Sequence, residues 1–135
     1  MNTFPMHLQS TTQYERVENV ISFIGEDHSG SFGVLPGHAR MMTLLRFGLA
    51  RFRVLGGDWE YLALPGALAY FLEGELYLSS RHYLRGKDYD GISAALEQEL
   101  LVEEDQLHAI KQSVHRLEEE MFKRLWKLKR SGEAL

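Results

Sequence analysis

The first 83 residues alternate short apolar runs with turn residues. Val, Ile, Phe, Tyr and Leu dominate these runs, and Gly, Pro, Asn, Asp or Ser separate them, a pattern typical of β-strands. Gly56-Gly57 and Glu73-Gly74 each separate two runs by two residues, a spacing that predicts tight hairpins. Many short strands at such spacing predict an antiparallel β-sandwich rather than parallel βαβ units. The expected strands are Phe4–Gln9, Gln13–Val17, Val20–Gly25, Ser31–Leu35, Met41–Arg46, Leu49–Leu55, Trp59–Ala63, Ala67–Leu72 and Leu76–Ser80.

The pattern changes sharply after residue 91. From Ile92 to Arg130 there is no Gly and no Pro, and good helix formers dominate. Asp88 or Asp90 can cap the start of a helix, and Gly132 follows its expected end. Apolar residues recur mostly every three or four positions, which places them on one helical face. They are Ile92, Leu96, Leu100, Leu107, Ile110, Val114, Leu117, Met121, Leu125 and Leu128.

These two patterns predict a β + α organisation. We expect a β-sandwich domain over residues 1–85, a linker over 86–91 and a helical C-terminal domain over 92–135. The helical segment is acidic at its start, where Glu97–Asp105 carries five acids and no base, and basic at its end. This order of charges suits the helix dipole.

The helical segment can fold in two ways. A hairpin of two helices needs a turn, and Asp105-Gln106-Leu107-His108 offers only a weak one. A single helix of about 40 residues, roughly 60 Å long, is the alternative, and its apolar stripe needs a partner. We favour the hairpin slightly, because it buries that stripe within the chain.

Composition limits the function. The 135 residues are 44% hydrophobic, which is ordinary for a folded protein, and the net charge of −4 argues against a nucleic-acid partner held by a basic surface. There is no cysteine, so disulfides and thiolate metal sites are excluded. No apolar stretch approaches the roughly 20 residues that a membrane span needs, and the N-terminus does not read as a signal peptide. We therefore expect no direct membrane insertion.

No catalytic or metal-binding pattern is present. The six histidines show no ligand spacing such as HExxH. Gly25–Ser31 superficially resembles a phosphate-binding loop, but it lacks the lysine and the following helix. We expect no cofactor, no metal and no enzymatic activity.

One loop carries a family resemblance. Gly33-Val34-Leu35-Pro36-Gly37-His38-Ala39 places an apolar pair between glycines, followed by a Pro-Gly turn and a histidine. This run, about 35 residues into a small β domain, resembles the epsilon subunit of F-type ATP synthases, and the likeness extends over nearly the whole chain. The resemblance implies a non-catalytic rotor component of the central stalk, which links the gamma subunit to the membrane ring of c subunits and couples ion translocation to ATP synthesis or hydrolysis.

The resemblance also implies two interfaces. By position, Ser31, Phe32 and His38 face the membrane ring. The basic end of the tail faces the alpha and beta catalytic subunits, where Lys123, Arg124, Lys127 and Arg130 form a candidate electrostatic brake on hydrolysis. The implied location is peripheral, on the cytoplasmic face of the bacterial inner membrane.

The chain departs from the family's pattern at several positions. Ser31 stands where an acid is frequent, and Arg40 where proline is frequent. At the start of the tail, Ile92-Ser93-Ala94-Ala95 replaces the pattern associated with ATP binding. These departures argue against regulatory ATP binding and point to the alternative, N-type bacterial ATPases. The competing interpretation is a free-standing β-sandwich binding module with a coiled-coil oligomerisation tail.

Overall fold

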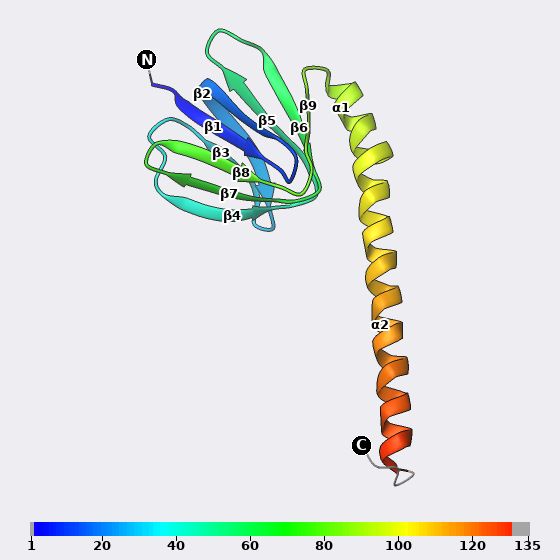
Figure 1. The fold of residues 1–135 in the computed structure, drawn as a ribbon. Coiled ribbons are helices and arrows are strands. Elements are labelled where there is room, and N and C mark those ends of the chain that lie inside the picture. Colours follow the sequence, from blue (N-terminus) through cyan, green and yellow to red (C-terminus); the bar gives the residue numbers. More distant parts are fainter. Residues whose placement is uncertain (1, 131–135) are drawn as a thin grey trace. The chain divides into compact units, whose positions relative to one another are not determined.

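The computed structural model describes residues 2–130 and shows strands followed by one long helix (Figure 1). The strands are β1 (Phe4–Gln9), β2 (Tyr14–Asp27), β3 (Gly30–Val34), β4 (Met41–Leu45), β5 (Gly48–Val54), β6 (Trp59–Leu64), β7 (Ala67–Leu72), β8 (Glu75–Ser79) and β9 (Leu84–Gly86). The helix comprises α1 (Tyr89–Ala95), a π-helical segment η1 (Leu96–Leu100) and α2 (Leu101–Arg130). The β + α prediction is confirmed.

The strands form a sandwich of two layers, and the longest strand, β2, belongs to both. The hydrogen-bonded order is β4-β7-β8-β1-β2-β5-β6-β9, and β3 also pairs with β2. The first half of β2 pairs with β1 and its second half with β3 and β5, so β2 belongs to both layers (Figure 1). Every described pair is antiparallel except β1 with β8, which run parallel. The sequence did not indicate this one parallel pair.

The strand β2 corrects a sequence expectation. We expected two strands, Gln13–Val17 and Val20–Gly25, with a break between them, but β2 is continuous. Asn19 has a φ of 59° within it, and the register with β1 shifts around this position. A bulge of this kind bends a strand without ending it. The break that we read in the sequence is therefore a bulge within one strand.

The core lies between the two layers. Phe4, Phe23, Phe52 and Phe71 come from β1, β2, β5 and β7 and are fully buried. The rings of Phe4 and Phe71 meet edge to face, with 5.6 Å between their centroids. Each fully buried phenylalanine contributes roughly 1.5–3 kcal/mol of transfer free energy, so these four residues are a substantial part of the core.

A second, smaller cluster anchors the start of the helix. Asp88 caps α1, because its carboxylate accepts a hydrogen bond from the Gly91 N–H. Ile92 and Leu100 are buried with Ala63 of β6, and Leu96 packs beside them. These helical residues are four apart, and a four-residue step overshoots one α-helical turn by about 40°. The wider turn of η1 offsets this drift, so the three side chains meet the sheet together.

The helix overturns the expected hairpin. Residues 101–130 form one uninterrupted α-helix, which continues through the weak turn at residues 105–108. That segment contains no Gly or Pro, so nothing in it stops the helix. The described residues form two compact units, divided after Leu101. The expected C-cap, Gly132, lies outside the described residues.

Candidate functional site

The residues expected to face the membrane ring lie on and after β3. Ser31 is exposed and pairs with Glu26 of β2, next to the hairpin that joins the two strands. Phe32 is half-buried and packs against the core, with its ring centroid 6.4 Å from that of Phe23. Part of the Phe32 side chain is therefore buried against the protein's own core.

His38 follows the Pro36-Gly37 turn. The backbone N–H of His38 donates a hydrogen bond to the Leu35 carbonyl over 3.1 Å, and Gly37 has a φ of 80°. A proline followed by a residue with positive φ is the requirement of a type II turn, which explains the Pro-Gly pair. The His38 ring donates from Nδ1 to the Ala39 carbonyl and packs edge-on against Phe71 at 5.8 Å. The turn and the ring contact fix the imidazole at this loop.

The structure does not bring these three residues to one point. Ser31 lies at the hairpin end of β3, whereas His38 follows the opposite end of that strand. Ser31 is three residue steps from the end of the strand at Val34, a distance of about 10 Å. An interface that includes both Ser31 and His38 must therefore extend along the whole of β3.

Hydrogen bonds to the Asp27 side chain hold the β2–β3 hairpin in place. The Asp27 carboxylate accepts hydrogen bonds from the Ser29 N–H at 2.9 Å and from the Thr43 hydroxyl at 2.6 Å. The Ser29 hydroxyl also donates to it. The hydrogen bonds from Ser29 and then Thr43 lower the pKa of Asp27 to about 2. The ionised carboxylate thus ties the hairpin to β4.

The basic residues expected to act as a brake lie on the last turns of α2. Lys123, Lys127 and Arg130 are three or four residues apart and share one side of the helix, while Arg124 is turned by about 100°. All four are exposed. They form one broad basic surface on the end of the helix.

Apolar side chains are exposed on β4, at one end of the strand order. Met42 and Leu44 are 70% and 68% exposed and point to the same face, because they are two residues apart in a strand. Exposed apolar residues that lie together mark protein-interaction surfaces. We call Met42 and Leu44 the β4 patch.

An aromatic row begins beside the β4 patch and crosses the outer face of the sheet. Met42 pairs with Tyr70, and Tyr70 pairs and stacks with Tyr77, with 4.6 Å between ring centroids. Tyr77 stacks in turn on His7, with 4.4 Å between centroids. The row therefore runs from β4 through β7 and β8 to β1.

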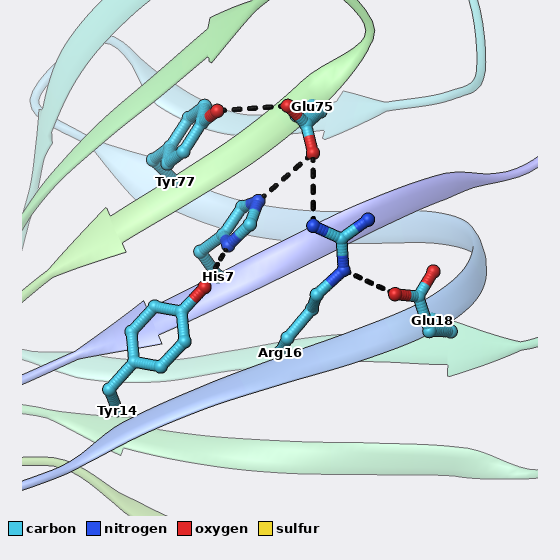
Figure 2. Close-up of polar contacts among 6 residues, drawn as sticks. All are labelled: His7, Tyr14, Arg16, Glu18, Glu75 and Tyr77. Carbon is cyan, nitrogen blue, oxygen red and sulfur yellow. Dashed lines mark hydrogen bonds and ion pairs between the residues drawn. The ribbon is translucent and has the colours of Figure 1, made fainter.

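His7 is the centre of a polar network at the far end of this row (Figure 2). Its Nδ1 lies 2.5 Å from the Tyr14 hydroxyl, and its Nε2 lies 3.1 Å from the Glu75 carboxylate. In the tautomer in which Nε2–H donates to Glu75, Nδ1 accepts a hydrogen bond from the Tyr14 hydroxyl. Hydrogen bonds from His7 and then Tyr77 lower the pKa of Glu75. Arg16 contacts Glu75 and Glu18 (Figure 2).

Sequence reasoning missed this network for a topological reason. His7 and Glu75 are separated by most of the domain, and only the parallel pairing of β1 with β8 brings them together. The alternation of residues in β1 does place His7 on the face opposite Met6 and Leu8. That alternation was the one available signal, but it does not identify the partner strand.

A second polar cluster lies beside β9. The Arg85 guanidinium lies 2.9 Å from Glu15 and 3.1 Å from Glu60, and the Tyr83 hydroxyl donates to Glu15. These residues line an open cavity of about 780 Å³. Burial raises the pKa of Tyr83 above its ordinary value, and its bond to Glu15 raises it further. The single guanidinium thus pairs with both carboxylates of the cluster.

Residues 2–130 lack two further features. None of their helices combines the length and apolar character that a membrane span requires. No three or more of their histidine or acidic side chains lie together as a metal site would require.

Known proteins resemble this chain mainly over the sandwich. The family model described as the ATP synthase delta/epsilon chain, β-sandwich domain, matches residues 5–81. ATP synthase epsilon chain 2 of Cereibacter sphaeroides is 34% identical over 61% of this chain and 57% of its own length. The chloroplastic ATP synthase epsilon chain of Pelargonium hortorum is 31% identical over 67% of this chain and 66% of its own. The matches thus span less than two thirds of these relatives.

Solved structures share the fold. A chain of the Euglena gracilis mitochondrial ATP synthase, solved as OSCP/F1/c-ring, aligns with a TM-score of 0.57 at 19% identity, covering 73% of this chain and 64% of that one. A chain of the Tetrahymena thermophila mitochondrial ATP synthase central stalk and c-ring aligns with a TM-score of 0.52 at 8% identity, covering 59% and 64%. Since the family model matches more than half of the chain, the protein belongs to the ATP synthase delta/epsilon family.

Proposed function

We propose that the protein is the non-catalytic epsilon subunit of the central stalk of an F-type ATP synthase. It links the gamma subunit to the ring of c subunits and rotates with them, so that ion translocation is coupled to ATP synthesis or hydrolysis. The observation that carries this proposal is the family match over residues 5–81, which covers nearly all of the sandwich. The proposed location is the cytoplasmic face of a bacterial inner membrane, held there through partners.

The β4 patch is the proposed docking surface for gamma. Its side chains are among the most exposed apolar ones in the sandwich, and burying apolar area is the main source of affinity between proteins. A stable interface of standard size buries above roughly 1,200 Å² in total. The adjoining aromatic row, with Tyr70 and Tyr77, provides further area of suitable character.

The membrane ring contacts the other proposed surface. Ser31, at the tip of the sandwich beside the β2–β3 hairpin, and His38, in the loop before β4, supply hydrogen-bonding groups for polar loops of a partner. Asp27 supports this surface indirectly, because its hydrogen bonds hold the hairpin in place. The half-buried Phe32 supports it from the core side.

The tail is proposed to act on the catalytic subunits. Lys123, Arg124, Lys127 and Arg130 lie in a segment, residues 123–130, that contains five bases and no acid, and this concentration of positive charge suits an acidic surface. Through these residues the tail restrains rotation in the direction of hydrolysis.

Titration with the cognate gamma subunit tests the proposal. We expect the full chain to bind gamma, and Met42→Glu to weaken this binding at least about tenfold, which corresponds to 1.4 kcal/mol. Leu55→Glu is the matched control, because Leu55 is an exposed leucine outside the patch. It should bind like the unmodified chain. No binding of the unmodified chain would refute the central claim, and equal loss in both variants would refute the assignment of the surface.

A further inference from the structure

The outer face of the β5–β6 pair carries two arginines that stack on one tryptophan. Arg51 and Arg53 are two residues apart in β5, so both project from one face of the sheet. That face is the outer one, because Phe52 between them is buried in the core. The guanidinium carbons of Arg51 and Arg53 lie 4.5 Å and 5.5 Å from the centroid of the Trp59 ring. We call Arg51, Arg53 and Trp59 the β5–β6 cluster.

The two arginines of the cluster have no acidic partner. Both are exposed, and within residues 2–130 neither forms an ion pair or a side-chain hydrogen bond. Two acids of the adjoining strands, Glu60 of β6 and Glu26 of β2, pair instead with Arg85 and Arg46. Two like charges about 7 Å apart along a strand repel each other. A negatively charged group that binds both arginines therefore relieves this repulsion.

The stacking on Trp59 orients the arginines for binding. A guanidinium is attracted to the face of an indole ring, and this contact leaves the N–H donors at its edge available. A carboxylate accepts two parallel hydrogen bonds from that edge. The cluster is therefore suited to a pair of carboxylates, one for each guanidinium.

A cavity of about 290 Å³ adjoins the cluster. Its lining includes Arg51, Ile24, Tyr61 and Tyr89. The rings of Tyr61 and Tyr89 meet edge to face, with 5.3 Å between their centroids. Tryptophan, tyrosine and arginine are the residue types that contribute most to the binding energy of protein interfaces. This combination indicates a protein partner, because a small free anion would use the arginines alone.

We propose that the β5–β6 cluster and the adjoining cavity form a docking surface for an acidic segment of a partner protein. Two carboxylates that are two residues apart in an extended segment lie about 7 Å from each other, which matches the spacing of Arg51 and Arg53. An apolar side chain of the same segment enters the cavity. The surface shares no residue with the β4 patch, so the proposal does not depend on the docking of gamma there.

NMR titration of the full chain with an acidic peptide tests the proposal. The probe is a peptide in which glutamate alternates with valine. The chain has two tryptophans, so the indole N–H signal of Trp59 reports on the cluster and that of Trp126 on the basic end of α2. We expect the Trp59 signal to shift saturably. Each exposed ion pair changes an equilibrium up to about fivefold, so Arg51→Gln with Arg53→Gln should weaken the binding measured at Trp59 at least about tenfold.

The matched control removes two exposed bases from α2. Lys111→Gln with Arg116→Gln changes the net charge by the same amount and should leave the response of Trp59 unchanged. Inorganic phosphate at the concentration of the peptide should not shift Trp59. A response of Trp126 alone, binding at Trp59 that survives the change of both cluster arginines, or equal binding of phosphate would overturn the proposal. A shift of Trp59 with protein concentration in the absence of peptide would also overturn it, because the occupant would then be a second copy of the chain.

Discussion

At the scale of single residues, the hydrogen bonds of Asp27 predict how the stability of the sandwich changes at acidic pH. Its pKa is lowered from 3.8 to about 2 by Ser29 and Thr43. A depressed carboxyl pKa stabilises the folded state above the unfolded-state value, and this stabilisation is lost as the pH falls through the folded-state value. We expect Asp27→Asn to be less stable than the unmodified chain at pH 7 and to lose less stability between pH 4 and pH 2. Urea unfolding at these pH values measures both differences.

The control for Asp27 is another aspartate. Asp58→Asn removes an exposed carboxylate in the turn between β5 and β6 and should leave the pH dependence as it is in the unmodified chain. If Asp27→Asn also retains that dependence, the hydrogen bonds to the hairpin do not stabilise the ionised form.

The His7 network makes a second residue-scale prediction. His7 is the largest cause of the lowered pKa of Glu75, and Tyr77 is the next. His7→Phe keeps an aromatic ring for stacking on Tyr77 but removes the donor to Glu75. We expect the pKa of Glu75 to rise toward its ordinary value, and less so in Tyr77→Phe. Carbon-detected NMR titration of the Glu75 carboxyl follows this change, and an unchanged pKa in His7→Phe would contradict it.

Single residues also show what sequence can reveal. The Pro36-Gly37 turn was predictable, because proline and a residue with positive φ define it locally. The role of His7 was not, since its partner Glu75 comes from a strand at the other end of the domain. Local conformational preferences can be read from neighbouring residues, whereas a contact between distant strands depends on the topology.

At the scale of elements, the strands and two hairpins were predictable: Gly56-Gly57 joins β5 to β6 and Glu73-Gly74 joins β7 to β8 as antiparallel pairs. The pairing of strands that are distant in the sequence was not predictable. The ranges expected for β1 and β7 match the structure residue for residue. The three-residue strand β9 was missed, because Leu84–Gly86 is too short to show alternation. The parallel pair β1–β8 was missed because nothing near either strand encodes the direction of its neighbour. Patterns of apolar residues report which face is buried, not which strand lies beside it.

The error in predicting the helix was of the opposite kind, because there the local sequence was given too little weight. We favoured a hairpin because it would bury the apolar stripe, yet the local sequence through residues 105–108 favours continued helix, and the helix continues. Local helix propensity thus outweighed burial of the stripe within the chain. The first turns of the helix are held by the sandwich through Ile92, Leu96 and Leu100.

This anchoring gives an element-scale prediction. Leu100 is fully buried between the helix and β6, and truncating a buried leucine to alanine costs about 2–5 kcal/mol. We expect Leu100→Ala to lower the local stability of α1 and η1, seen as faster amide exchange at Leu96, while the amides of β2 stay protected. Leu101→Ala, at an exposed neighbouring leucine, is the control. Equal exchange in the two variants would show that Leu100 does not anchor the helix.

At the scale of the whole molecule, the continuous helix separates its own charges. Asp105 and Lys123 are 18 residues apart in the sequence, which is about 27 Å along a helix. That distance exceeds the Debye length of about 8 Å at physiological ionic strength. The acidic start of the helix therefore cannot neutralise the basic end of the same helix. A hairpin would have placed the two segments side by side. The positive charge of the basic end is therefore not neutralised within its own helix, which suits the acidic partner surface that we propose.

The last prediction concerns this basic end in the assembled enzyme. Each exposed ion pair contributes at most about 1 kcal/mol, or roughly a fivefold change in an equilibrium, so several bases must act together. Changing Lys123, Arg124, Lys127 and Arg130 together to Ala should relieve inhibition of ATP hydrolysis, while each single change should have a small effect. Lys111→Ala removes a base from the middle of the same helix and is the matched control.

The rate of ATP hydrolysis by the complex, measured with and without residues 91–135, gives the total inhibition caused by the tail. If the tail acts as an electrostatic brake, the truncated complex and the quadruple variant should hydrolyse ATP at similarly raised rates, and added salt should raise the rate of the unmodified complex toward theirs, because salt screens exposed charges. Equal rates with and without the tail would mean that it does not restrain hydrolysis. A raised rate on truncation alone would assign the brake to other residues of the tail, with the exposed Phe122 and Trp126 the next side chains to change.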